Sequence, residues 1–155
     1  MNMIRISEAG AAAIREHGQR CYPEECCGTI LGTAGGQGER LITTLLPLEN
    51  RNETSRRNRF LIEPEDILQA EKRARGSGVE LIGFYHSHPD CEAQPRLFDL
   101  EHAWPWYIYV ILSVRQGRAG SLTCWQLSED RSRFTPVELV LVSCELSSKG
   151  ETNNA

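Results

Sequence analysis

An apolar run from Val79 to Tyr85 leads directly into His86-Ser87-His88-Pro89, and this stretch constrains the fold more than any other. The run is long enough for a buried β-strand. Alternate side chains of an extended backbone share a face, so His86 and His88 can point at one centre. Pro89 cannot donate a hydrogen bond to a neighbouring strand and is expected to end this one.

A carboxylate follows the two histidines at a short distance along the chain. Asp99 lies after a loop, at the start of a predicted helix, where its side chain can fold back toward the imidazoles. Two neutral histidine nitrogens and one carboxylate are the protein ligands of an open catalytic zinc site, with the fourth position left to water. Zinc lowers the pKa of such a water toward about 7. The sequence therefore predicts Zn²⁺ as cofactor, held by His86, His88 and Asp99.

A zinc hydrolase also needs a general base, and the candidate is Glu25 in the segment Pro23-Glu24-Glu25-Cys26-Cys27-Gly28. Together these residues resemble the JAMM/MPN+ metalloproteases, whose pattern is an early Glu, then His-x-His, seven residues, Ser, two residues and Asp. The resemblance covers most of the chain. It implies that His86, His88 and Asp99 bind zinc and that Glu25 holds and deprotonates the water.

One position departs from the family pattern. Where the family has a serine that stabilises the tetrahedral oxyanion, this sequence has Arg96. Loss of one oxyanion donor costs about 3 kcal/mol, or a hundredfold in rate. Arg96 is permanently charged and rich in N–H groups, so it can donate in place of the serine, block the site or extend into solvent.

The remaining sequence predicts one α+β domain over residues 1–145, with a disordered tail over 146–155. The expected architecture is a curved mixed or antiparallel sheet flanked by two or three helices, and the resemblance implies the same MPN/JAB, cytidine-deaminase-like layer. The predicted strands are Met3–Ile6, Cys26–Leu31, Leu41–Leu48, Phe60–Ile62, Val79–Tyr85, Tyr107–Val114, Ser121–Leu127 and Phe134–Val142.

Two longer helices are predicted from apolar periodicity and end signals. The first begins after Ser7 as N-cap and carries an apolar stripe, and the second begins at Pro64 and ends at Gly76. The stripe of the first helix is Ala9, Ala13, Ile14, His17 and Cys21, and the buried side of the second is Ile67, Ala70 and Ala74. His17 is interpreted as a packed histidine.

Composition narrows the class of protein. The net charge is −4, so the sequence does not have the basic character of a nucleic-acid-binding protein. No apolar run is long enough to cross a membrane. Charged residues interrupt the first eighteen positions, so no signal peptide is expected and the predicted location is cytoplasmic. The six cysteines are then expected to be free thiols, although the sequence leaves disulfides open.

Several residues near the site have alternative interpretations. Cys91 and His102 lie close enough in sequence to be considered as further ligands. The segment that contains Cys91 is expected to be a loop leading away from the site, and a fourth ligand at His102 would close the position that hydrolysis needs. Trp104 and Trp106 are interpreted as core or rim packing. The arginine-rich segment Glu49 to Arg59 is a solvated surface loop or, by resemblance, a surface for an acidic partner.

Two functions are compatible with these residues. The first is a zinc metallopeptidase or isopeptidase that cleaves after the Gly-Gly tail of a ubiquitin-like protein. By resemblance to the prokaryotic single-domain branch, its partner is a small ubiquitin-fold sulfur carrier. The alternative is a catalytically impaired binding or scaffold module for such a partner. The feature that supports this alternative is Arg96 in place of the family serine. Nucleoside deamination is set aside because the chain lacks the required Pro-Cys-x-x-Cys. Oligomeric state is open.

Overall fold

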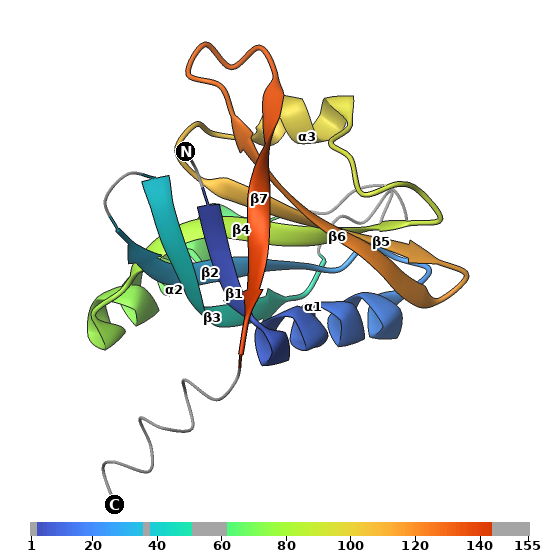
Figure 1. Cartoon of the computed structure of the whole chain (residues 1–155), viewed down its shortest axis with the longest axis horizontal. Helices are drawn as coiled ribbons and strands as arrows, with labels where there is room; N and C mark the ends of the chain where they lie inside the picture. The colour runs from blue at the N-terminus through green and yellow to red at the C-terminus, as the bar shows by residue number, and fades with distance from the viewer. Residues whose placement is uncertain (1–2, 36–37, 51–61, 144–155) are drawn as a thin grey trace, which may run out of the picture.

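The computed structural model describes residues 3–35, 38–50 and 62–143 (Figure 1). Within these ranges the chain forms ten regular elements. They are β1 (Met3–Ser7), α1 (Glu8–Cys21), β2 (Cys27–Ala34), β3 (Glu39–Leu48), α2 (Pro64–Ser77), β4 (Glu80–Pro89), α3 (Leu97–His102), β5 (Ile108–Arg115), β6 (Arg118–Leu127) and β7 (Phe134–Val142).

The strands form one mixed sheet in the order β1-β3-β2-β4-β5-β6-β7, which closes into a barrel because β1 pairs with both β3 and β7. The pairs β1–β3, β1–β7 and β4–β5 are parallel, and the other neighbours are antiparallel. The prediction of an α+β fold with a curved mixed sheet and two or three helices is confirmed. The curvature is strong enough to close the sheet.

Two apolar clusters fill the space around the sheet. The larger joins the barrel interior to α1, and its members include Ile4, Ile6, Ile14, Ile30, Ile82, Val110 and Leu112. The smaller lies beneath α2, against β2, β4 and β5, and includes Leu31, Ala70, Ala74, Phe84 and Tyr109. β4 and β5 contribute to both clusters, so both faces of each strand are buried. Their sequences are therefore nearly continuous apolar runs. β4 is therefore a rigid support for the histidines at its end.

Local signals at helix ends are mostly confirmed. Ser7 caps α1, and its Oγ accepts a 2.9 Å hydrogen bond from the Gly10 amide. The α1 stripe is partly wrong, since Ile14 and His17 are buried but Ala9 and Ala13 are exposed. Ala11 and Gly18 are buried in their place, so the face of α1 that packs on the sheet is rotated from the predicted stripe.

The second helix begins at Pro64 as predicted but runs to Ser77, past Gly76. The left-handed residue is Gly78, at φ 71°, whose amide bonds back to the last helical carbonyls. Both glycines satisfy the sequence signal for a helix end, and only the positive φ distinguishes them. The prediction of Gly76 as the stop is therefore wrong by two residues.

Some predictions lie outside the described residues. These include most of the arginine-rich segment, Phe60 and Leu61 of the strand predicted at Phe60–Ile62, and the tail 146–155. The five cysteines within the described ranges, which exclude the sixth, are free thiols. Among the described helices, none has the length and apolar character needed to span a membrane.

Candidate metal centre

β4 positions both histidines at its end, and it ends at Pro89 as predicted. Both imidazoles are fully buried, and their Nε2 atoms lie 3.1 Å apart. The prediction that alternate positions bring the two rings to one centre is confirmed. Parallel pairing with β5 carries the strand past the histidines, matching His86 with Ile111 and His88 with Ser113.

Asp99 reaches this point from the first turn of α3. One carboxylate oxygen, Oδ1, lies 3.2 Å from His86 Nε2, and the other, Oδ2, lies 3.3 Å from His88 Nε2. Oδ2 also accepts a 2.7 Å hydrogen bond from the backbone amide of Arg96, the N-cap residue of α3. This bond holds the carboxylate over the helix start, so Asp99 folds back toward the imidazoles as predicted.

The three side chains fit a small divalent cation. Their ligand atoms all lie within 4.8 Å of one another, and all three residues are buried. Two nitrogens bound to zinc at about 2.05 Å with tetrahedral angles are about 3.3 Å apart, close to the observed separation of the two Nε2 atoms. Two imidazoles and one carboxylate also have the donor chemistry that zinc prefers, with one position left open.

The electrostatics of the cluster favour the protonation states that a metal requires. Burial lowers the pKa of His86 because it disfavours the imidazolium, and this outweighs the opposing effect of Asp99. Burial alone would raise the pKa of Asp99. The neighbouring His86 imidazole and the hydrogen bond from the Arg96 amide more than reverse this, so the pKa of Asp99 is lowered. The site thus presents a carboxylate and a neutral His86 to a cation.

Glu25 is placed beside the histidines by the pairing of β2 with β4. Cys27 is opposite His86 in the ladder, and the Cys26 amide donates a 2.8 Å hydrogen bond to Ser87 Oγ. The Glu25 carboxylate is buried, and its Oε1 has no hydrogen-bond partner among the described residues. Burial raises the pKa of Glu25 to about 8, although the Arg96 guanidinium acts in the opposite direction. An unpaired oxygen and a raised pKa are typical of a general base.

Arg96 contacts Glu25 directly, through an ion pair between its Nη2 and Glu25 Oε2. The arginine side chain is 32% exposed and that of Glu25 is fully covered, so the guanidinium forms part of the cover over the carboxylate. Of the three roles considered for Arg96, extension into solvent is excluded by this contact. Donation to an oxyanion and obstruction of the site both fit the position.

The loop after β4 supplies support that no sequence signal indicated. The Glu92 carbonyl accepts a 2.9 Å hydrogen bond from His88 Nδ1, which leaves Nε2 to face the centre. The sequence could not reveal this partner, because a backbone carbonyl is available at every residue.

A buried pair behind β4 was also missed. His17 Nδ1 and the Tyr85 hydroxyl are 2.8 Å apart, so His17 packs against the strand as predicted and has a specific partner.

The other residues considered near the site lie outside the ligand group. His102 is exposed and donates from Nδ1 to the Phe98 carbonyl at 2.8 Å, and Cys91 is also exposed. Trp104 and Trp106 are 58% and 44% exposed, which fits rim packing and excludes the core. The group found within the described residues contains only His86, His88 and Asp99.

The chain is similar in sequence to a known protein family and to several of its relatives. A family model described as prokaryotic homologs of the JAB domain matches residues 7–128. The chain is 34% identical over 92 residues to a desampylase of Haloferax volcanii, covering 59% of this chain and 63% of the relative. It is 34% identical over 83 residues to a probable TtuB-protein conjugate cleaving protease of Thermus thermophilus, covering 53% and 55%. The matched region thus spans less than two thirds of these relatives.

Solved structures resemble the chain over most of its length. A protein from Desulfitobacterium hafniense has a TM-score of 0.79 at 25% identity, covering 91% of this chain and 94% of that one. A protein from Salinibacter ruber has a TM-score of 0.70 at 37% identity, covering 89% and 91%.

Proposed function

Because the chain belongs to the family of prokaryotic homologs of the JAB domain, we propose that it is a zinc-dependent peptidase or isopeptidase. Its substrate is an amide bond after the Gly-Gly tail of a ubiquitin-like or sulfur-carrier protein. The observation that carries the proposal is the convergence of His86, His88 and Asp99 with Glu25 beside them.

The chain's own residues divide the work of hydrolysis. When bound by the three ligands, zinc supplies a Lewis acid that acidifies water and polarises the scissile carbonyl. Glu25 takes a proton from the attacking water through the unpaired Oε1 and passes it to the leaving amine. The Arg96 guanidinium, already within the site, donates to the oxyanion that develops on the carbonyl oxygen. Glu92 and the Arg96 amide keep His88 and Asp99 oriented throughout.

The substrate class rests on the relatives. Two relatives are named desampylase, and the name of the third describes a protease that cleaves TtuB-protein conjugates. From these names we infer that this chain hydrolyses an amide bond in a protein conjugate. Since the matched region spans less than two thirds of each relative, the substrate is part of the proposal. Free buried thiols at Cys26, Cys27 and Cys124 suit a reducing compartment, and we place the reaction in the cytoplasm.

The contact between Arg96 and Glu25 favours a second function. If Arg96 permanently holds Glu25 and fills the open face, the protein is a binding module that retains zinc and a ubiquitin-like tail without cleaving it.

The experiment that tests the proposal combines metal analysis with turnover. Zinc content is measured by elemental analysis on protein purified without chelator, beside His88→Ala and Asp99→Ala. We expect about one zinc per chain in the parent, lost in both variants.

Turnover is measured on a ubiquitin-like carrier extended beyond Gly-Gly. Glu25→Gln should keep zinc but lose at least a hundredfold in kcat, because it removes the base and leaves the ligands. Zinc without cleavage in the parent would favour the binding module, and equal cleavage by Glu25→Gln would refute the mechanism.

A further inference from the structure

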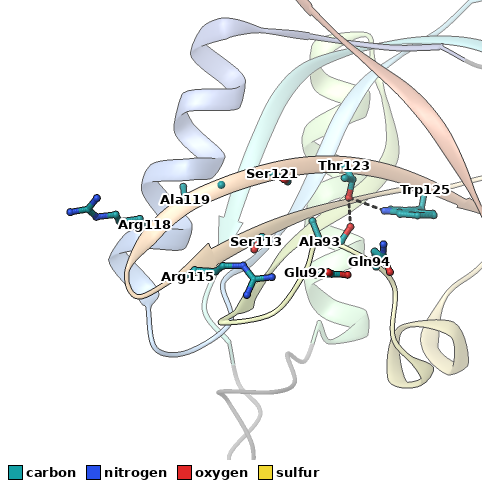
Figure 2. A pocket seen from close by; sticks show the side chains of 11 residues that line it. Glu92, Ala93, Gln94, Ser113, Arg115, Arg118, Ala119, Ser121, Thr123 and Trp125 are labelled. Atoms are coloured by element: carbon teal, nitrogen blue, oxygen red, sulfur yellow. Dashed lines mark hydrogen bonds between the residues drawn. The ribbon is translucent and has the colours of Figure 1, made fainter.

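A cleft lies between the loop that follows β4 and one face of β5 and β6 (Figure 2). Its volume is about 650 Å³. Ser113 alternates with Leu112 and Val114, which belong to the core, so the face that lines the cleft is the outer face of the sheet. Gly120 has no side chain and Ser121 has a small one, which leaves this face hollow.

The wall of the cleft is fixed to the sheet and to the metal centre. Ser113 Oγ donates to the Cys91 carbonyl and Thr123 Oγ1 donates to the Ala93 carbonyl, each at 2.6 Å. Between them, the Glu92 carbonyl accepts from His88 Nδ1. Three successive carbonyls are thus anchored, and Figure 2 shows the Thr123 bond together with that from Trp125 Nε1. The loop that orients His88 is also the wall of the cleft.

A second cavity extends the cleft to the catalytic residues. It has a volume of about 460 Å³ and shares Gln94 and Trp125 with the first. Arg96, Leu97 and Leu100 also line it, so it reaches the arginine that contacts Glu25. The two cavities form a path from Arg96 past Trp125 to the turn between β5 and β6.

This path is strongly basic in an acidic protein. Its charged lining consists of Arg96, Arg115, Arg118 and Arg133 against Glu92 alone, whereas the chain carries a net charge of −4. Arg115 and Arg118 are exposed and form no salt bridge with any acidic side chain in the described part of the chain. In Figure 2, Arg115 lies over the cleft and Arg118 points outward at its end. Their charges are available to a partner.

We propose that this cleft receives an acidic peptide segment of the protein substrate on the leaving-group side of the scissile bond. The proposal rests on the function proposed above and names a substrate preference of the same site. Unpaired arginines around a polar cavity attract carboxylates and recognise them through forked hydrogen bonds.

The size of the cleft assigns it to the leaving-group side. The residues before the scissile bond are Gly-Gly, which have no side chains and need only a narrow passage. A cavity of about 650 Å³ holds several side chains, and these belong to the protein from which the modifier is removed. An acidic sequence around the modified amine therefore determines which conjugates are cleaved fastest.

The test compares three fusion substrates built on one ubiquitin-like carrier. One has a neutral Gln-rich peptide after Gly-Gly, one has the matched Glu-rich peptide there, and one has the Glu-rich segment before Gly-Gly. We expect kcat/KM to be about fivefold higher for Glu after the bond than for Gln, as two exposed charge pairs allow. Arg115→Glu combined with Arg118→Glu should abolish or invert the preference, because two arginines that attract carboxylates are replaced by carboxylates that repel them. Arg73→Glu combined with Arg75→Glu makes the same charge change on α2 and should retain it.

Binding without turnover separates this proposal from the proposed function. Anisotropy of a labelled Glu-rich peptide is measured on zinc-loaded Glu25→Gln, with and without the Arg115 and Arg118 reversals. Peptide binding lost on reversal supports the cleft even if no substrate is cleaved. Equal cleavage of Glu and Gln substrates, with no peptide binding, overturns the cleft and leaves the hydrolase intact. A preference only for Glu before Gly-Gly, or stronger competition by an oligonucleotide than by the peptide, also overturns it.

Discussion

Arg96→Ser restores the residue type of the family pattern and tests what the guanidinium does. In the parent protein, Arg96 forms an ion pair with a carboxylate whose side chain is fully covered. The pKa of Glu25 is about 8 even though Arg96 opposes the effect of burial. Serine has no charge, so the substitution leaves the buried carboxylate without that partner.

Two effects set the magnitude. An adjacent cation lowers a carboxyl pKa by about 1–3 units, so its loss raises the pKa of Glu25 by that amount. Each unit lowers the ionised fraction of the base about tenfold at neutral pH. Loss of one oxyanion donor costs a further hundredfold, of which the serine hydroxyl can recover part. We therefore expect kcat/KM at pH 7 to fall at least about a hundredfold in Arg96→Ser.

The assay is the pH dependence of kcat/KM on a Gly-Gly fusion, with zinc content measured in parallel. A base acts when deprotonated, so activity rises with pH, and the midpoint of this rise should move to higher pH in Arg96→Ser. Arg96→Lys keeps the charge without the forked donors and should lose less. Arg73→Ser on α2 is the surface control. Faster turnover in Arg96→Ser would refute this reasoning and identify Arg96 as an obstruction, and an unmoved midpoint would show that Arg96 does not set the pKa of the base.

Three further results are expected. Gly28→Ala should lower the free energy of unfolding by about 1–3 kcal/mol in urea titrations, because the new Cβ would lie 2.2 Å from the Tyr85 ring. Burial lowers the pKa of His17, so its contribution to the free energy of unfolding is complete above about pH 6.5 and is lost as the pH falls. In His17→Gln, the free energy of unfolding should therefore decline less steeply with falling pH. Free zinc at a hundred times its Kd should stabilise the protein by about 2.7 kcal/mol in thermal unfolding, and His88→Ala should abolish the effect.

The grouping of the three candidate ligands was predictable because it depends on rules that act over short distances. His86 and His88 alternate on one strand, and Asp99 starts a helix, so their approach follows from backbone periodicity. Glu25 is different, since it lies 61 residues before His86. Only the pairing of β2 with β4 brings it to the site, and the sequence indicated it through the family pattern.

The rest of the site depends on contacts that the sequence does not encode locally. The hydrogen bond from His88 to the Glu92 carbonyl uses a group present in every residue. The contact of Arg96 with Glu25 depends on which of several long rotamers the arginine takes. The closed barrel was also missed, because closure arises from the parallel pairing of β1 with β7, at opposite ends of the described chain.

The position of the proposed general base therefore depends on one strand register. Cys27 opposite His86 places Glu25 beside the candidate metal ligands, and the ring of Tyr85 over Gly28 fixes that register by close packing. A slip of one residue between β2 and β4 would turn each β2 side chain to the other face, and Glu25 would leave the site. Two hydrogen bonds also oppose such a slip: the Cys26 amide donates to Ser87 Oγ, and the Ser87 amide donates to the Cys26 carbonyl. Because Ser87 separates the two histidines, the residue that holds the Glu25 segment in place lies within the proposed metal-binding motif itself.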